Sequence, residues 1–218
     1  MKKFFYLVAL VAISLLFVQC EQNGMGSASG THKGHKYVDL GLPSGLKWAT
    51  CNVGANSSDE YGDYFAWGET DPKEYYYWDT YKYTTIEDAL IKYNNSDNKI
   101  VLDPEDDAAT ANWGGSWRMP TDTEFTELIK QCAWTWTTQA GVNGYKVVGK
   151  NGKSIFLPAP RSSVNIISGN RSSSGDYWSS SLYTDDPGYA YAVYFDSSEV
   201  SRYDYDRYYG LSVRPVCK

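Results

Sequence analysis

The sequence predicts an α+β domain with two helices packed on a mostly antiparallel sheet, and three observations support this fold class. Thr121 and Glu124 form a capping box, and the apolar residues after them recur at helical spacing. Asn151-Gly152 is a strong two-residue hairpin signal, which predicts antiparallel strands on either side. Segments with strand alternation then continue to the C-terminus. This order of strand, two helices and several strands allows the first and last strands to pair.

The first twenty residues contain three successive parts. Two lysines precede an uncharged apolar run over residues 4–18, which has the length of a signal-peptide core and is short for a membrane span. Cys20 follows directly, so we expect residues 1–19 to be a lipoprotein signal peptide and Cys20 to be the lipidated N-terminus. The alternative is an ordinary secretory signal cut elsewhere, because Phe17 and Gln19 depart from the residues usual before such a cysteine.

Residues 20–36 are rich in Gly and Ser and have no apolar period, so they predict a flexible tether. Residues 37–218 have the length of one globular domain. His32 and His35 have metal-like spacing, but they fall in the predicted tether, and we expect neither a metal site nor a cofactor. The formal net charge of −6 argues against nucleic acid as a partner.

The first half of the domain has weaker signals. Residues 37–55 predict two short strands around a Pro-Ser-Gly turn. Residues 72–100 are polar with a cluster of aromatic residues, and predict a long loop-rich insertion with one helical turn at 86–93. Asp103 is the predicted N-cap of the first helix, with Pro104 in its first turn and its end near Gly114.

After the second helix, strands are predicted to the end of the chain. The segments "DYWSSSLY", "YAYAVYFD" and "LSVRPV" are the clearest strand candidates. Alternation predicts that Val193 and Phe195 face the core while Tyr194 and Asp196 face outward. Leu211 and Val213 are further core candidates.

The tail of the domain has an unusual composition. Residues 176–209 contain nine Tyr, six Asp and six Ser among 34 residues. Tyrosine supplies a large contact area with few rotatable bonds, and Ser and Asp supply adaptable hydrogen bonds, as in antibody binding loops. We therefore predict a ligand-binding surface, although a soluble tail with a purely structural role is the alternative. The predicted contact residues are Tyr183, Asp185, Asp186, Tyr189, Tyr191, Tyr194, Asp196, Tyr203, Asp204, Tyr205, Asp206, Tyr208 and Tyr209.

Six segments spread over residues 37–218 resemble a known family. They are "YVDLGLPSGLKWATCNVGA", "YFAWGET", "GGSWRMPTDTEFTEL", "NGYKVVGKNGKSIFLPA", "YWSSS" and "GLSVRPV". Together they resemble the Fibrobacter succinogenes major paralogous domain, which is common in lipoproteins of Bacteroidetes. This resemblance implies a C-type lectin-like fold of the formylglycine-generating-enzyme-like branch. It also implies a cell-envelope location, lipid-anchored to the outer membrane and surface-exposed.

The resemblance implies a fold rather than a chemistry. The three iron-binding histidines of some relatives, the paired C-terminal cysteines of copper-binding relatives and the calcium motif of lectins have no counterparts here. We therefore expect a binding protein with a protein or glycan ligand and no enzymatic activity. An enzyme of the sulfatase-modifying branch and a structural envelope component are the alternatives. Arg214 matches the closing arginine-containing strand and is expected to be structural.

Two further expectations follow from the resemblance. Variable proteins of diversity-generating retroelements share this fold, and mutagenesis of their C-terminal region yields Tyr, Asp, Ser and Asn. The tail of this chain resembles such a region in composition.

Three cysteines remain after export to an oxidising compartment, so one thiol is left over. Because the first and last strands of this fold lie close together, Cys51 and Cys217 are the expected disulfide, with Cys132 as the free thiol.

Overall fold

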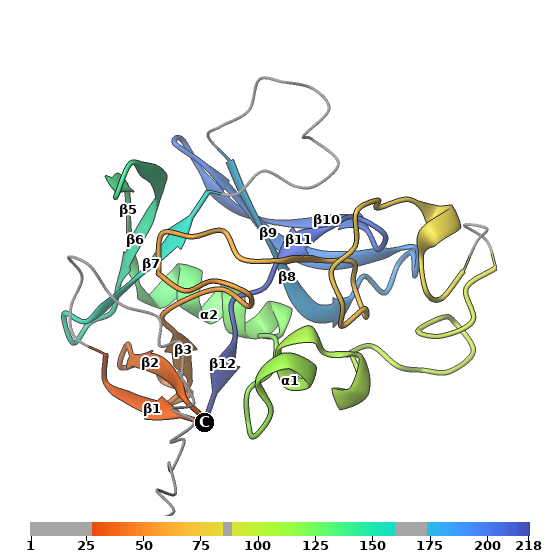
Figure 1. The fold of residues 1–218 in the computed structure, drawn as a ribbon, viewed down its shortest axis with the longest axis horizontal. Coiled ribbons are helices and arrows are strands. Elements are labelled where there is room, and N and C mark those ends of the chain that lie inside the picture. Colours follow the sequence, from red (N-terminus) through yellow and green to blue (C-terminus); the bar gives the residue numbers. More distant parts are fainter. Residues whose placement is uncertain (1–27, 85–88, 160–173) are drawn as a thin grey trace, which may run out of the picture.

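The structure is a computed structural model that describes residues 28–84, 89–159 and 174–218. Over these residues the fold is mixed α and β and mostly sheet, with two α-helices and mainly antiparallel strands (Figure 1). The predicted α+β class is confirmed at this level. None of the helices in these ranges is long and apolar enough to cross a membrane. The predicted signal peptide and the Cys20 lipidation site lie outside the described residues.

The strands form three sheets. Their orders are β1-β2-β3-β12, β10-β9-β8-β11-β4 and β5-β6-β7, and β11 runs parallel to β8 while the other pairs are antiparallel. The strand bounds are β1 Gly30–His32, β2 His35–Asp39, β3 Lys47–Ala49, β4 Tyr64–Phe65, β5 Ala133–Gln139, β6 Val142–Val148, β7 Ser154–Pro158, β8 Ser174–Leu182, β9 Tyr189–Asp196, β10 Val200–Asp206, β11 Leu211–Ser212 and β12 Val216–Cys217.

The last strand closes the sheet that the first strands begin. β12 pairs antiparallel with β3, as predicted, and the C-terminus lies beside β1–β3 (Figure 1). Arg214, just before β12, is fully buried and donates hydrogen bonds to Asn52 Oδ1 and to the carbonyls of Ala49 and Thr50. These bonds tie the C-terminal segment to the residues after β3, so Arg214 has the expected structural role.

Helix α2, Asp122–Gln131, begins at the predicted capping box. The Thr121 side chain accepts a hydrogen bond from the Glu124 backbone, and the Glu124 side chain accepts one from the Thr121 backbone. Arg118 holds the same Glu124 carboxylate with both guanidinium nitrogens, at 2.7 and 2.6 Å. Phe125 and Leu128 are buried against the core.

The first helix begins later than predicted. Residues Pro104–Asp106 form only the 3₁₀ turn η2, and helix α1 runs over Ala108–Trp113 and ends at Gly114, as expected. Asp103 makes no side-chain cap bond, whereas the Asp107 carboxylate accepts from the backbone N–H of Thr110. Asp107 is therefore the N-cap.

The predicted hairpin at residues 151–152 exists, but its loop is longer than two residues. β6 ends at Val148 and β7 begins at Ser154, so residues 149–153 form the connection. The backbone N–H of Gly152 bonds the Gly149 carbonyl within this loop, and Gly152 takes a φ of 79° that favours glycine.

The predicted tether extends too far into the domain. Residues 30–36 form β1 and the start of β2, joined by Lys33 and Gly34 with φ values of 47° and 84°. The His35 ring stacks on the Trp113 ring with centroids 3.7 Å apart. The backbone carbonyl of His32 accepts a hydrogen bond from the indole N–H of Trp117. Aromatic packing against the helix α1 region holds this polar hairpin in place. Its sequence has no apolar periodicity from which the two strands could be predicted.

The long insertion over residues 72–100 is confirmed in its described part. It contains the 3₁₀ turn η1, Trp78–Thr80, and residues 89–93 contain no helix, so the predicted turn at 86–93 is wrong where the structure describes it. Tyrosines anchor the insertion because their rings are buried in the core: Tyr76, Tyr81, Tyr83 and Tyr93.

The five-stranded sheet has a core cluster on each face. Tyr177, Val193 and Phe195 pack with α2 and the β5–β7 sheet. Trp178 and Ala192, on alternate positions of the same strands, pack with the insertion. Val193 and Phe195 therefore face a core, as the alternation predicted.

The expected Cys51–Cys217 disulfide is wrong. Cys217 is a buried free thiol, and Cys132 is a free thiol at the C-cap of α2. Burial raises the pKa of both thiols, that of Cys132 to about 11. The pairing of β3 with β12 is correct, but Cys51 lies two residues beyond β3 while Cys217 lies opposite Lys47 within the ladder.

Candidate binding site

The five-stranded sheet divides the predicted contact residues between its two faces. Tyr194 pairs with Ser201, and Tyr203 pairs with Ala192, so Tyr194, Tyr203 and Tyr205 share one face. Tyr189, Tyr191 and Asp204 occupy the alternate positions and lie on the opposite face. The single aromatic surface that the sequence predicted is therefore divided between two faces, which meet along the edge strand β10.

The first group lines a pocket of about 440 Å³. This tyrosine pocket is formed by the start of β8, by β9, by the edge strand β10 with the turn before it, and by the segment before β11. Its lining residues are Ser174, Asp176, Tyr194, Glu199, Tyr203, Tyr205 and Tyr209.

The walls of the tyrosine pocket are a chain of ring contacts. The ring centroids of Tyr194 and Tyr203 are 6.3 Å apart, those of Tyr203 and Tyr205 are 5.0 Å apart, and those of Tyr205 and Tyr209 are 5.8 Å apart. Tyr203 is 53% exposed, whereas the other three rings are half-buried. Tyr205 and Tyr209 also pack against the core cluster around Trp178, so the wall is held from below.

A carboxyl group lies in this pocket and is almost fully buried. Asp176 is 3% exposed, and its Oδ1 accepts a 2.7 Å hydrogen bond from the Tyr205 hydroxyl. Burial raises the pKa of Asp176 to about 6, because the charged form loses its hydration. Within the ranges that the structure describes, no lysine or arginine forms an ion pair with it.

The turn between β9 and β10 forms one rim of the pocket. The Asp196 carboxylate accepts bonds from the Ser198 backbone and hydroxyl, both at 2.7 Å, and from the Tyr194 hydroxyl at 2.9 Å. These bonds lower the pKa of Asp196 to about 2. Asp196 therefore acts as a turn cap that orients Tyr194, while Glu199 lies on the rim itself.

Arg207 supports the other end of the pocket, between β10 and Tyr209. It is fully buried, and it donates to the Tyr81 hydroxyl and to three backbone carbonyls, including that of Pro187. Its guanidinium carbon lies 4.9 Å from the Trp67 ring centroid, and three tyrosine rings complete the cage. This internal anchor positions the neighbouring Tyr208, whose ring centroid is 5.0 Å from that of Trp78, and Tyr209.

The second group of tyrosines surrounds an ion pair on the opposite face. The Arg202 guanidinium lies 3.7 Å from the Tyr191 ring centroid and bonds the Asp122 carboxylate at 2.6 Å. Tyr183 contacts the Tyr191 ring edge-on at 5.3 Å. Because the charge of Arg202 is already paired with α2, this group resembles a packed contact more than an open site.

The remaining predicted contact residues have varied positions. Asp185 and Asp186 are exposed in the β8–β9 loop, where Asp186 accepts from the Gly188 backbone. Asp204 and Asp206 lie along the edge strand and line a neighbouring hollow of about 470 Å³ that shares Tyr203, Tyr205 and Tyr209 with the tyrosine pocket. Neither aspartate of the β8–β9 loop lines either hollow.

Three pocket residues were not among the predicted contacts: Ser174, Asp176 and Glu199. Asp176 precedes the buried "YWSSS" strand, and its polarity at a strand position was the available signal. Only the pairing of β8, β9 and β10 brings it beneath Tyr205.

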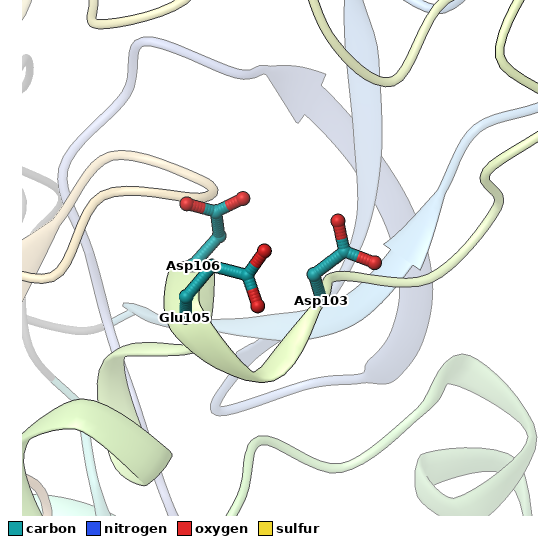
Figure 2. Close-up of side chains that lie close together, drawn as sticks. All are labelled: Asp103, Glu105 and Asp106. Atoms are coloured by element: carbon teal, nitrogen blue, oxygen red, sulfur yellow. The ribbon is translucent and has the colours of Figure 1, made fainter.

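Three carboxylates gather at the turn before α1, at Asp103, Glu105 and Asp106 (Figure 2). The ammonium group of Lys92 contacts all three, at 2.8 Å from Asp103 and 3.6 Å from Glu105, and in a still closer contact with Asp106. Lys82 adds a second ammonium at 2.9 Å from Asp106. The protein's own cations thus neutralise this cluster, and it joins the insertion to the α1 region.

Comparison of the chain with protein-family models, with curated proteins and with solved structures gives no match. These comparisons therefore show no family for the chain.

Proposed function

We propose that this chain is a ligand-binding lipoprotein of the cell envelope, anchored to the outer membrane through Cys20, with a C-type lectin-like domain and no enzymatic activity. The single observation that carries the binding role is the tyrosine pocket. Four tyrosine rings and a buried carboxyl converge there, beside the outermost described strand of the five-stranded sheet. Half-exposed aromatic clusters of this kind mark interaction sites, and tyrosine loses little conformational entropy on binding.

Three features support the proposed C-type lectin-like fold. The last strand pairs with the first strands of the domain, a loop-rich insertion follows them, and the described residues contain two helices. The proposed anchoring is supported by the order of basic, apolar and cysteine residues at the start of the chain. The proposed ligand is a protein or a glycan at the bacterial surface.

The binding role is tested by screening the full-length protein against glycan and peptide arrays. Tyr203→Ser is the informative variant because Tyr203 is the exposed wall of the pocket. Tyr75→Ser is its control because Tyr75 is 65% exposed and lines neither the tyrosine pocket nor the neighbouring hollow. We expect some array ligands to bind both the wild type and Tyr75→Ser but not Tyr203→Ser. Ligands that both variants retain equally would place the binding surface elsewhere. Stoichiometric copper or iron in the purified protein would instead favour an enzyme of the sulfatase-modifying branch.

Diversification by a retroelement is supported by the composition of residues 176–209 and by their placement. The edge strand β10 and the turn before it carry the variable-looking residues, while Leu211, Val213 and Val216 are fully buried scaffold. Sequencing of the neighbouring DNA tests this. A reverse transcriptase gene and a near-copy of the stretch encoding residues 176–218 are expected, and their absence would contradict it.

A further inference from the structure

We propose that the tyrosine pocket binds a positively charged side chain of a protein ligand, a lysine ammonium or an arginine guanidinium, with the Asp176 carboxylate as its counter-ion and the tyrosine rings as its walls. This inference rests on the proposed binding function and names the ligand class of the same site.

Among the described residues, the lining of the pocket supplies no cation to its one buried carboxyl, that of Asp176. Its lining contains two carboxyl groups, Asp176 and Glu199, and no lysine or arginine among the described residues. A buried carboxylate is stable only when a charge or several hydrogen-bond donors compensate it. Tyr205 supplies one donor to Asp176 Oδ1. A ligand cation entering the pocket would supply the missing charge.

The aromatic walls suit the same ligand. A cation over a tyrosine face gains electrostatic attraction from the ring, and several rings together form the cages that recognise ammonium groups. Tyr203, Tyr205 and Tyr209 form such a series, with neighbouring centroids 5.0 and 5.8 Å apart. A volume of about 440 Å³ is sufficient for one side-chain head group and part of its stem.

The chain already holds two of its own cations in this way. Arg207 is enclosed by Trp67 and three tyrosines in the core, and Arg202 lies 3.7 Å from the ring centroid of Tyr191 beside the Asp122 carboxylate. The Arg202 arrangement combines a tyrosine face with a carboxylate. The tyrosine pocket presents the same two components, and none of its described lining residues is a cation.

A neutral sugar is the weaker fit. Tyrosine rings can stack on a sugar and their hydroxyls can bond it, but a neutral ligand leaves the buried Asp176 charge uncompensated. An anionic ligand would be repelled by both carboxylates of the lining. The electrostatics of the described lining therefore favour a cation.

The inference is tested by NMR titration of the full-length protein with small probes at pH 7. Nα-acetyl-lysine amide and Nα-acetyl-arginine amide are the cationic probes. The neutral comparisons are Nα,Nε-diacetyl-lysine amide, Nα-acetyl-citrulline amide and a panel of methyl glycosides. We expect at least one cationic probe to bind, with a dissociation constant on the order of 1 mM as for a single side chain, and its neutral counterpart to bind at least tenfold more weakly.

Asp176→Asn is the decisive variant, because the amide oxygen still accepts from Tyr205 while the charge is lost. It should weaken binding of the cationic probe at least tenfold, whereas Asp71→Asn, which changes an exposed carboxyl just before the insertion, should not change it. Binding at pH 5 should be about tenfold weaker than at pH 7, since Asp176 with a pKa of about 6 is then mostly protonated.

The outcomes separate this inference from the function on which it rests. Binding of the lysine probe, the arginine probe or both, with loss in Asp176→Asn, supports the inference and identifies the head group. No binding of either cation at 50 mM (roughly the practical limit for such weak contacts), or equal binding to Asp176→Asn, overturns it. If array ligands that depend on Tyr203 contain no basic group, the inference fails while the proposed binding function stands.

Discussion

The Tyr205 hydroxyl donates a 2.7 Å hydrogen bond to the Asp176 carboxylate, and this bond links the edge strand β10 to β8 across the intervening strand β9. The residues of β9 opposite Tyr203 and Tyr205 on this face are Ala192 and Ala190, whose small side chains leave room for the tyrosine ring. The two alanines of β9 therefore leave space for the Tyr205 ring to reach over the strand to Asp176.

Removing the charge of Asp176 should stabilise the protein at neutral pH. Because burial raises its pKa to about 6, folding favours the protonated form, and stability falls as the pH rises from the unfolded pKa near 4 to about 6. Asp176→Asn should therefore be more stable than the wild type at pH 7, by up to about 3 kcal/mol, and equally stable near pH 3. Urea unfolding at both pH values measures this gap.

Asp196→Asn provides a control of opposite sign. Hydrogen bonds from Ser198 hold the pKa of Asp196 at about 2, so its charged form stabilises the fold above the unfolded pKa and that stability is lost as the pH falls through about 2. Asp196→Asn should be less stable than the wild type at pH 7. Two variants that shifted in the same direction would show that the environments of these carboxyls are assigned incorrectly.

Replacing the caged arginine should destabilise the whole domain. Arg207→Lys keeps the charge but cannot reach the Tyr81 hydroxyl and three carbonyls together, so buried acceptors lose their donors. We expect a loss of about 3 kcal/mol in the free energy of unfolding. A melting temperature within two or three degrees (roughly 0.5 kcal/mol) of the wild type would show that Arg207 is not an anchor.

Shortening a buried side chain of β11 should cost more stability than a change to the pocket wall. Leu211 is fully buried, so Leu211→Ala should lose about 2–4 kcal/mol. Tyr203→Ser should change stability by about 0.5 kcal/mol or less, since its ring is largely exposed. Chemical unfolding of the two variants side by side checks this, and an equal loss in both would mean that Tyr203 belongs to the core.

The lipid anchor is tested by Cys20→Ala in the full-length chain. Because Cys20 follows an apolar run directly, its removal should abolish labelling by a radioactive or clickable fatty acid and release the domain from the membrane fraction. Acyl labelling that persists in this variant would contradict the proposed lipidation site.

The sequence predicted the elements whose signals are local. Thr121 and Glu124 contact each other within one turn, and the alternation around Val193 and Phe195 follows from strand geometry alone. The β1–β2 hairpin at residues 30–36 was missed because its polar residues are held by Trp113 and Trp117, which are distant in sequence.

The site was less predictable, since it depends on which strands are neighbours. The tyrosine content of the tail indicated aromatic side chains near a surface, but sorting them between the two sheet faces required the register of β9 and β10. Asp176 shows the same limit. Its role follows from its position two strands away from Tyr205, and no local pattern in "SGDYW" encodes that distance.

The most direct test of the account is the ionisation of Asp176 itself, measured from its side-chain carboxyl ¹³C shift as the pH is varied in the full-length protein. The account predicts a midpoint near 6 in the free protein and a lower midpoint when Nα-acetyl-lysine amide is present, because the bound cation stabilises the charged carboxyl. A midpoint near 4 in the free protein, or one that the amine leaves unchanged, would contradict a cation-binding pocket built around a buried Asp176.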